Sequence, residues 1–365
     1  DIRAAVNRIY GDESKQLEIP DLVHFASWVG GDMDGNPNVN AKTIRATLAR
    51  QRSLILDLYF NECAVISAKL SQSVDCATFS QGMLDKIEEY RGIFQNAYHA
   101  VPARHREMPY RVFLRIVQQR LQSTYDDDIY PYEKVEQLIE DIELIAESLS
   151  CNKGRHAGLF VVRRLLRRIR AFGFHMVTLD VRQDAEVHRK VVGECLGDEN
   201  WMERTAEERA ERIIEAINTR ESAPMTLSTQ ARKTIAVFQA IAFCRRKYGS
   251  RAIGTFIVSM TEGADDVLSV LLLAQWGELH NRRGEVPLDI APLLETVDDL
   301  HAGPEILEAL LSSDLYREHL KRRKNRQTVM VGYSDSNKDG GLASSRWAIQ
   351  NAQELLVNAM DSEDI

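Results

Sequence analysis

Residues 254–276 read GTFIVSMTEGADDVLSVLLLAQW, and this stretch holds a complete strand, turn and helix. Its first seven residues form the short apolar run that is typical of a buried strand. Residues 264–276 form a longer and strongly apolar segment, as expected of a helix in a protein interior. The polar residues Thr261 and Glu262 separate the two segments. A strand followed directly by a helix is the unit from which parallel α/β sheets are built.

The same order recurs along the second half of the chain. Strands are predicted over residues 174–181, 254–260, 287–294 and 327–331. Helices are predicted over residues 184–196, 231–248, 264–276, 297–312 and 343–359. This alternation predicts βα units around a parallel sheet, and a barrel is the arrangement that fits it best.

The first half of the chain has a helical pattern. Apolar periodicity with proline punctuation predicts helices over residues 41–70, 85–101, 110–122, 133–149 and 157–171. We expect residues 26–150 to form a glycine-rich loop and a helical array, and residues 155–365 to form consecutive βα units. The predicted fold class is a predominantly helical α/β protein that contains part of a (β/α)8 TIM-type barrel with many additional helices. Residues 1–365 would then belong to one large barrel domain.

Composition argues against several functional classes. The chain has 365 residues, with 46 basic against 54 acidic residues and a net charge of −8, which argues against bulk nucleic-acid affinity and an anionic membrane surface. The longest apolar stretch, residues 267–276, is too short to cross a bilayer. No secretory signal opens the sequence, and the five cysteines include no CxxC pair, so we expect free thiols and a cytoplasmic protein. The basic segments 163–170 and 319–326 are interpreted as solvated parts of helices.

Polar and charged residues follow each predicted strand at the point where it ends. In a parallel barrel these ends open onto one face, where active sites are built. Glu295 and Asp335 could supply two carboxylates to Mg²⁺ or Mn²⁺, Arg182 could bind a phosphate through its planar fork, and Lys338 could neutralise developing negative charge. The alternatives are a surface ion pair between Arg182 and Asp184, and a helix N-terminal role for Glu295. Both cations are expected to be exposed, so removing either should leave stability nearly unchanged.

A glycine-rich segment near the N-terminus, residues 25–39, reads FASWVGGDMDGNPNV. Gly30 and Gly31 allow the backbone to fold tightly around a ligand, and Asp32 and Asp34 add charge. No Gly-Lys-Ser/Thr follows, the GxGxxG spacing is absent, and the glycine and glutamate of an EF-hand loop are not in place, so these three site types are rejected. The alternative interpretation is an irregular turn before a helix.

Four segments, in order, resemble the central motifs of the phosphoenolpyruvate carboxylase family. They are FASWVGGDMDGNP at residues 25–37, LDVRQDAEVH at 179–188, PLLETVDDL at 292–300 and VGYSDSNKDGG at 331–341. The resemblance spans nearly the whole chain, although residues 72–150 and 197–250 match only in helical character.

The resemblance implies an eight-stranded βα barrel in an allosteric homotetramer that requires Mg²⁺ or Mn²⁺. The family carboxylates phosphoenolpyruvate with bicarbonate to oxaloacetate and phosphate, through carboxyphosphate and a metal-stabilised enolate. The residues that match the family's functional positions are Glu295 and Asp335 as metal ligands, Arg182 as a phosphate-binding residue, Lys338 as a catalytic residue, and Trp28, Gly30, Gly31 and Asp34 beside the substrate pocket.

Two departures from the family pattern stand out. The family's loop usually reads GGDRDGNP, and here Met33 occupies the position of the arginine. The family's catalytic histidine motif would lie before Asp1, and its glycine- and arginine-rich loop after Ile365. We therefore expect a piece of a longer protein that is inactive alone. Two other functions remain open: a different barrel that acts on phosphoenolpyruvate or pyruvate, and a helical interaction scaffold with a vestigial site.

Overall fold

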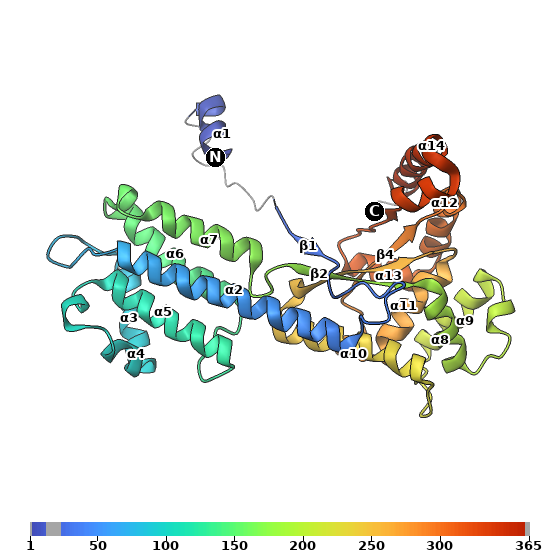
Figure 1. The fold of residues 1–365 in the computed structure, drawn as a ribbon, viewed down its shortest axis with the longest axis horizontal. Coiled ribbons are helices and arrows are strands. Elements are labelled where there is room, and N and C mark those ends of the chain that lie inside the picture. Colours follow the sequence, from blue (N-terminus) through green and yellow to red (C-terminus); the bar gives the residue numbers. More distant parts are fainter. Residues whose placement is uncertain (1, 12–22, 362–365) are drawn as a thin grey trace. The chain divides into compact units, whose positions relative to one another are not determined.

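The computed structural model describes residues 2–11 and 23–361, which divide into two compact units (Figure 1). The first unit comprises the described residues of Asp1–Phe25 and Gln51–Met176, and the second those of Ala26–Arg50 and Val177–Ile365. The glycine-rich loop, which the sequence groups with the helical array, therefore belongs to the second unit. Membership of one large barrel domain remains a prediction.

The first unit is helical in its described residues. Its elements are α1 (Ile2–Tyr10), the larger part of α2 (Ala41–Lys69), α3 (Gln81–Ile93), α4 (Gln95–His99), the 3₁₀ turn η2 (Ala103–His105), α5 (Pro109–Asp126), α6 (Val135–Cys151), the 3₁₀ turn η3 (Gly154–His156) and α7 (Leu159–Phe172). One continuous apolar core joins α2 to α7, and Tyr59, Phe113 and Ile142 are fully buried in it. Burial of one apolar face per helix thus holds this unit together.

The predicted helix over residues 85–101 is divided in the structure. Phe94 has φ −105° and ψ 51°, which are not helical values, so α3 ends before it and α4 begins after it. The ring of Phe94 packs edge-on against Tyr90 at 5.6 Å. Pro109 lies at the start of α5, where its missing N–H costs nothing. The proline punctuation therefore located this start correctly, whereas nothing in the sequence marked Phe94.

The second unit contains a parallel sheet of five strands in the order β1-β2-β3-β4-β5. The strands are β1 (Ala26–Ser27), β2 (Thr178–Asp184), β3 (Ile253–Ser259), β4 (Asp289–Leu294) and β5 (Met330–Val331). The other elements are α8 (Ala185–Leu196), η4 (Trp201–Glu203), α9 (Ala206–Asn218), α10 (Thr229–Tyr248), η5 (Ser250–Ala252), α11 (Ala264–Trp276), α12 (Val297–Ser312), α13 (Asp314–Arg322) and α14 (Tyr333–Asp361). The predicted helices over 264–276 and 297–312 are confirmed at both ends.

The two faces of this sheet bury different residues. Leu179 and Val181 point to the large core shared with the helices, whereas Ile257 and Leu293 belong to a small separate cluster on the other side. A parallel sheet that is covered by helices on one side and filled by side chains on the other is built like the wall of a barrel. The predominantly helical α/β class is thus confirmed, and closure into eight strands remains a prediction.

Further segments also differ from the predicted elements. The polar stretch after β5, which lies before the helix predicted over residues 343–359, is helical from Tyr333 and is interrupted only at Gly341, where φ is +77°. The first predicted strand begins four residues later, at Thr178, and continues through Asp184. Helix α9 was not predicted, although a capping box between Thr205 and Glu208 marks its start.

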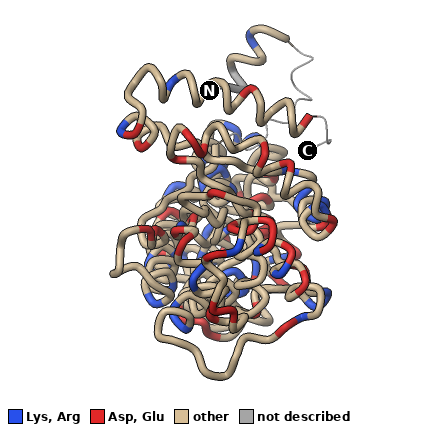
Figure 2. The backbone as a smooth tube through the Cα atoms, turned by 90° about the vertical axis from the view of Figure 1, so that its right-hand side faces the viewer, with Lys and Arg blue, Asp and Glu red and all other residues tan. Residues whose placement is uncertain are grey.

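Charged residues of both signs occur along the chain (Figure 2). Basic and acidic residues are interspersed on the side of the chain shown in Figure 2. Within residues 2–11 and 23–361, no helix is both long enough and apolar enough to cross a membrane.

Candidate active site

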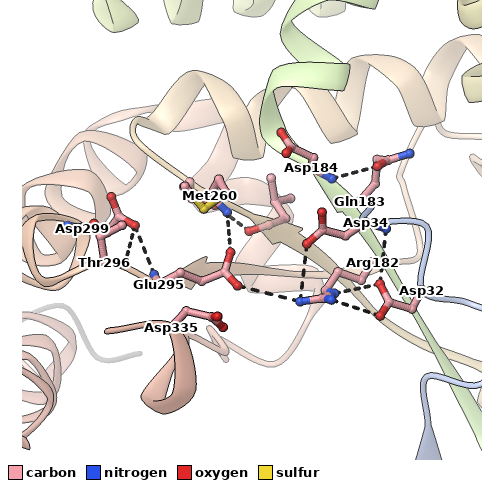
Figure 3. Close-up of polar contacts among 12 residues, drawn as sticks. Asp32, Asp34, Arg182, Gln183, Asp184, Met260, Glu295, Thr296, Asp299 and Asp335 are labelled. Carbon is pink, nitrogen blue, oxygen red and sulfur yellow. Dashed lines mark hydrogen bonds and ion pairs between the residues drawn. The ribbon is translucent and has the colours of Figure 1, made fainter. Parts of the chain in front are cut away.

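Arg182 is surrounded by three carboxylates at the C-terminal end of β2 (Figure 3). Its Nε and Nη2 bind both oxygens of Asp32, at 2.8 and 3.0 Å. Its Nη1 lies 3.5 Å from Asp34 Oδ2 and 3.8 Å from Glu295 Oε1. The guanidinium carbon is 4.9 Å from the ring centre of Trp28, within cation–π range. The bond to Asp32 is the main cause that raises the pKa of Arg182.

This arrangement corrects two expectations. The side chain of Arg182 is only 18% exposed, so it is not the exposed cation that the sequence suggested. Its partner is also not Asp184, which caps α8 by accepting a hydrogen bond from the backbone N–H of Glu186 at 2.6 Å. Arg182 therefore neutralises the acidic end of the sheet and contributes to folding as well as to any ligand site.

The glycine-rich loop is held beside β2 by backbone contacts. Arg182 N donates to Gly31 O at 3.0 Å, and Met33 N donates to Arg182 O at 2.9 Å. A Cβ on Gly31 would lie 2.2 Å from the carbonyl oxygen of Asp180, and Gly30 has φ +89°. Both positions therefore require glycine, for close approach and for left-handed backbone respectively. The segment consists of irregular turns before α2, as the alternative interpretation states, and Asp32 and Asp34 within it form ion pairs with Arg182.

Met33 points away from these carboxylates. It is buried in the large core between sheet and helices, where Leu179 and Ile44 also lie. Asp32 pairs with Arg182 in a parallel β-bridge, and successive side chains of such an extended segment point to opposite sides. Asp32 and Asp34 therefore share one side, and Met33 points to the other. Met33 is accommodated here as a core residue.

Glu295 follows the last residue of β4 and is buried. Its Oε2 accepts a hydrogen bond of 3.0 Å from the backbone N–H of Met260, a non-glycine residue with φ +52°. Burial is the largest cause that raises the pKa of Glu295, and the charges of Asp34 and Asp335 raise it further. Glu295 lies one residue before the N-cap of α12, as the alternative of a helix N-terminal carboxylate requires, but Thr296 and Asp299 form the capping box and the Glu295 carboxylate accepts from Met260 N.

Asp335 and Lys338 lie one turn apart in the first segment of α14. Lys338 Nζ donates to Asp335 Oδ1 at 2.8 Å, and the two side chains are 73% and 48% exposed respectively. Figure 3 shows the carboxylate of Asp335 beneath Glu295, with no direct bond drawn between them. Among the described residues, the structure thus brings Asp34, Arg182 and Glu295 into contact and places Asp335 and Lys338 at the edge of the same cluster.

The charges of this cluster fit a divalent cation. Asp32, Asp34, Glu295 and Asp335 face two cations, Arg182 and Lys338, which leaves an excess of two negative charges. Oxygen donors are the ligands that Mg²⁺ and Mn²⁺ prefer, and Mg²⁺ commonly binds one or two carboxylates together with water. In the described part of the chain, no three acidic, histidine or cysteine side chains are arranged around one point. Two protein ligands, completed by substrate and water, would suit this donor set.

Two contributions to the site were not predicted from the sequence. Asp32 was noted only as a charge, although its spacing of two from Asp34 places both on one side of an extended segment. The backbone N–H of Met260 carries no sequence signal, because it depends on the left-handed conformation of a residue that ordinarily avoids it.

Comparison with known proteins extends over the whole chain. A family model described as phosphoenolpyruvate carboxylase matches residues 1–365. The chain is 44% identical over 355 residues to the phosphoenolpyruvate carboxylase of Xanthomonas campestris pv. campestris strain 8004, covering 97% of this chain and 39% of the relative. It is 33% identical over 373 residues to that of Bradyrhizobium diazoefficiens, covering 97% and 39%. The chain thus spans about 39% of the length of these relatives. It belongs to the phosphoenolpyruvate carboxylase family.

Proposed function

We propose that this chain supplies the metal- and phosphate-binding half of a site that carboxylates phosphoenolpyruvate with bicarbonate, giving oxaloacetate and phosphate. The observation that carries the proposal is the acidic cluster around Arg182, in which four carboxylates face two cations at the C-terminal ends of parallel strands. Family membership supports it, since the curated relatives are named for this activity.

The residues would divide the work as follows. Glu295 and Asp335 would hold Mg²⁺ or Mn²⁺, which when bound supplies electrostatic stabilisation of charge on the enolate oxygen. Arg182 would bind the phosphate through Nη1, the nitrogen whose carboxylate contacts are longest, while Asp32 keeps its fork in place. Lys338 would leave Asp335 and stabilise negative charge on the migrating phosphate. These assignments involve no proton transfer by this part of the chain.

Trp28 and the glycine turn would form one wall of the substrate pocket. Trp28 lies over the guanidinium of Arg182, so that its ring shields the cation from water on that side. Gly30 and Gly31 allow the backbone to approach the strand, and Asp34 lies where it contacts both the cation and the acidic cluster. Exclusion of water would protect the enolate from protonation before carbon dioxide is captured.

The proposal extends to properties of the whole enzyme. We expect an allosteric cytoplasmic homotetramer, and we expect residues 1–365 alone to turn over no phosphoenolpyruvate, because the chain spans about 39% of its relatives. Measurable turnover by residues 1–365 alone would contradict this expectation.

The test of the function is the release of phosphate from phosphoenolpyruvate by the full-length enzyme with and without bicarbonate. We expect phosphate and oxaloacetate in equal amounts and only when bicarbonate is present. Phosphate or pyruvate formed independently of bicarbonate would indicate a different phosphoenolpyruvate enzyme, and no metal-dependent chemistry at all would indicate a scaffold.

A further inference from the structure

Asp339 lies near Asp335 and Lys338 in sequence, but its carboxylate contacts a different segment. Its Oδ2 accepts a hydrogen bond of 3.0 Å from the backbone N–H of Val297, 42 residues away. Val297 is the first residue of α12 and lies two positions after Glu295. This bond therefore joins the two segments that carry the proposed metal carboxylates.

Close backbone contacts hold the same two segments together. Gly332 N donates to Leu294 O at 2.7 Å. A Cβ on Gly332 would lie 3.0 Å from the Cα of Glu295, and a Cβ on Gly340 would lie 2.8 Å from Cγ2 of Val297. The first segment of α14 thus contacts two neighbours. Its N-terminal end, next to Gly332, lies against the end of β4. Its C-terminal end, which contains Asp339 and Gly340, lies against the start of α12.

Glu295 is fixed by other groups. Asp299 Oδ2 accepts hydrogen bonds from the backbone N–H of Glu295 at 3.1 Å and of Thr296 at 2.9 Å. Met260 N binds Oε2 of the Glu295 carboxylate, as described above. These contacts orient Glu295 without involving α14.

Within α14, the buried Ser336 next to Asp335 bonds Gly332 O and the hydroxyl of Ser345, both at 2.6 Å. The turn at Gly332 and the bond from Asp339 are the contacts that join this segment to the end of β4 and the start of α12.

We propose that Asp339 is a positioning residue, which holds the Asp335-bearing segment against the start of α12 and so sets the separation of Asp335 from Glu295 for a divalent cation. The inference rests on the proposed function, because it takes these two carboxylates as ligands. Mg²⁺ demands near-ideal octahedral geometry, so a displaced carboxylate weakens binding. Groups that orient metal ligands typically contribute about 10- to 100-fold in affinity.

The experiment measures Mn²⁺ binding to the full-length enzyme, without substrate, by electron paramagnetic resonance. Asp339→Ala should raise the Kd at least about 10-fold. Asp339→Asn should bind nearly as well as the wild type, because an amide oxygen still accepts the N–H of Val297. Asp298→Ala is the matched control. It removes an exposed carboxylate from the first turn of α12, next to Val297, and it should leave the Kd unchanged.

A second variant breaks the same bond from the donor side. Val297→Pro removes the N–H at the first helical position, where proline is favoured, and the ψ of 167° at Thr296 is compatible with a following proline. It should weaken Mn²⁺ binding as Asp339→Ala does, and the double variant should bind no more weakly than either single one. If Asp339→Ala does not fold, Val297→Pro and Asp339→Asn decide the question.

Glu295→Gln distinguishes a failure of the metal assignment from a failure of the positioning role of Asp339. If Glu295→Gln abolishes Mn²⁺ binding while Asp339→Ala and Val297→Pro bind as the wild type does, the positioning inference is overturned and the proposed function stands. If Glu295→Gln binds Mn²⁺ normally, the metal assignment fails and the inference fails with it. Thermal unfolding, recorded for every variant, should show similar midpoints for Asp339→Asn and Asp298→Ala.

Discussion

Each of the two units contains a cluster of polar side chains, and the clusters differ in charge balance. In the helical unit, Asp141 accepts hydrogen bonds from Tyr90 at 3.0 Å and Tyr132 at 2.6 Å, with Arg120 3.7 Å away. One carboxylate thus meets two hydroxyl donors and one guanidinium. In the unit with the sheet, four carboxylates meet only two cations. A balanced network stabilises a fold, whereas an unbalanced one at strand ends has room for a ligand of opposite charge.

Replacement of Arg182 should have the largest effect, because this residue serves both fold and site. Arg182→Ala would leave three carboxylates without their shared cation, at a cost of about 2 kcal/mol in unfolding free energy, reduced by partial exposure. Turnover should fall by a factor on the order of 10²–10³. Arg182→Lys should recover little, because an ammonium cannot reproduce the two bonds to Asp32.

Differential scanning calorimetry and steady-state kinetics on the full-length enzyme measure both effects. If Arg182→Ala had wild-type turnover and an unchanged melting temperature, the acidic cluster at the strand ends would need no central cation. That result would contradict the difference drawn here between the two clusters.

Lys338→Ala should separate the two properties. The side chain of Lys338 is 73% exposed, and its ammonium forms an ion pair with Asp335. An exposed pair contributes little to stability, so the melting temperature should change little. Turnover should fall by a factor on the order of 10²–10³ if the charge stabilises the migrating phosphate. Lys190→Ala is the control, since Lys190 is an exposed lysine in an ion pair with Glu186 on α8. Equal kinetics for the two variants would remove Lys338 from the site.

The balanced cluster predicts the reverse pattern. Asp141→Ala would leave two tyrosine hydroxyls without their acceptor and Arg120 without its counter-charge, which should cost about 3 kcal/mol of stability. Turnover per folded molecule should stay near the wild-type value. Glu140→Ala, which removes an exposed carboxylate from the same helix, provides the control for thermal unfolding. A large loss of kcat in Asp141→Ala without loss of stability would show that this cluster is also a functional site.

Acid should destabilise the second unit through His188. Burial lowers the pKa of His188 to about 4 from an ordinary 6.5, although the charge of Asp266 opposes the shift. The unfolded chain therefore takes up a proton at a pH where the folded protein does not. Stability is complete above about pH 6.5 and is lost as the pH falls toward 4, by about 2 kcal/mol at pH 5.

The measurement is the melting temperature between pH 8 and pH 5. His188→Phe should flatten this dependence, because the replacement ring does not titrate, and the exposed His301→Gln should not. An unchanged pH dependence in His188→Phe would show that other groups cause the acid sensitivity.

Sequence patterns predicted α11 and α12, whose ends are marked locally, but missed α9, whose start is marked by a capping box as well. The capping box at Thr296 and the apolar run that begins at Ala264 lie in the chain itself, and both helices were confirmed to the residue. No helix was predicted in the segment between β5 and residue 343, where Ser, Asp, Asn and Gly favour turns. Its helix is supported by tertiary contacts of Asp339 and Gly332, which no local pattern reveals.

The same limit applies to the site. Polar residues at strand ends predicted that Arg182, Glu295, Asp335 and Lys338 would converge. The structure brings Arg182 within 3.8 Å of Glu295, and it places Asp335, with its partner Lys338, near enough for the charge of Asp335 to raise the pKa of Glu295. The sequence could not indicate that Arg182 binds Asp32, 150 positions away, because that pairing depends on how the glycine turn lies against β2. Assignment of the metal ligands themselves remains a prediction.

The most direct test of the unbalanced cluster is a crystal structure of the full-length enzyme with Mn²⁺, located by its anomalous scattering. We predict one ion at the end of β4, with carboxylate oxygens of Glu295 and Asp335 both at about 2.0–2.2 Å for Mg²⁺ and slightly further for Mn²⁺, and with Lys338 displaced from Asp335. An ion held by Asp32 and Asp34 instead, with Glu295 still bound only to Met260 and Arg182, would contradict this account.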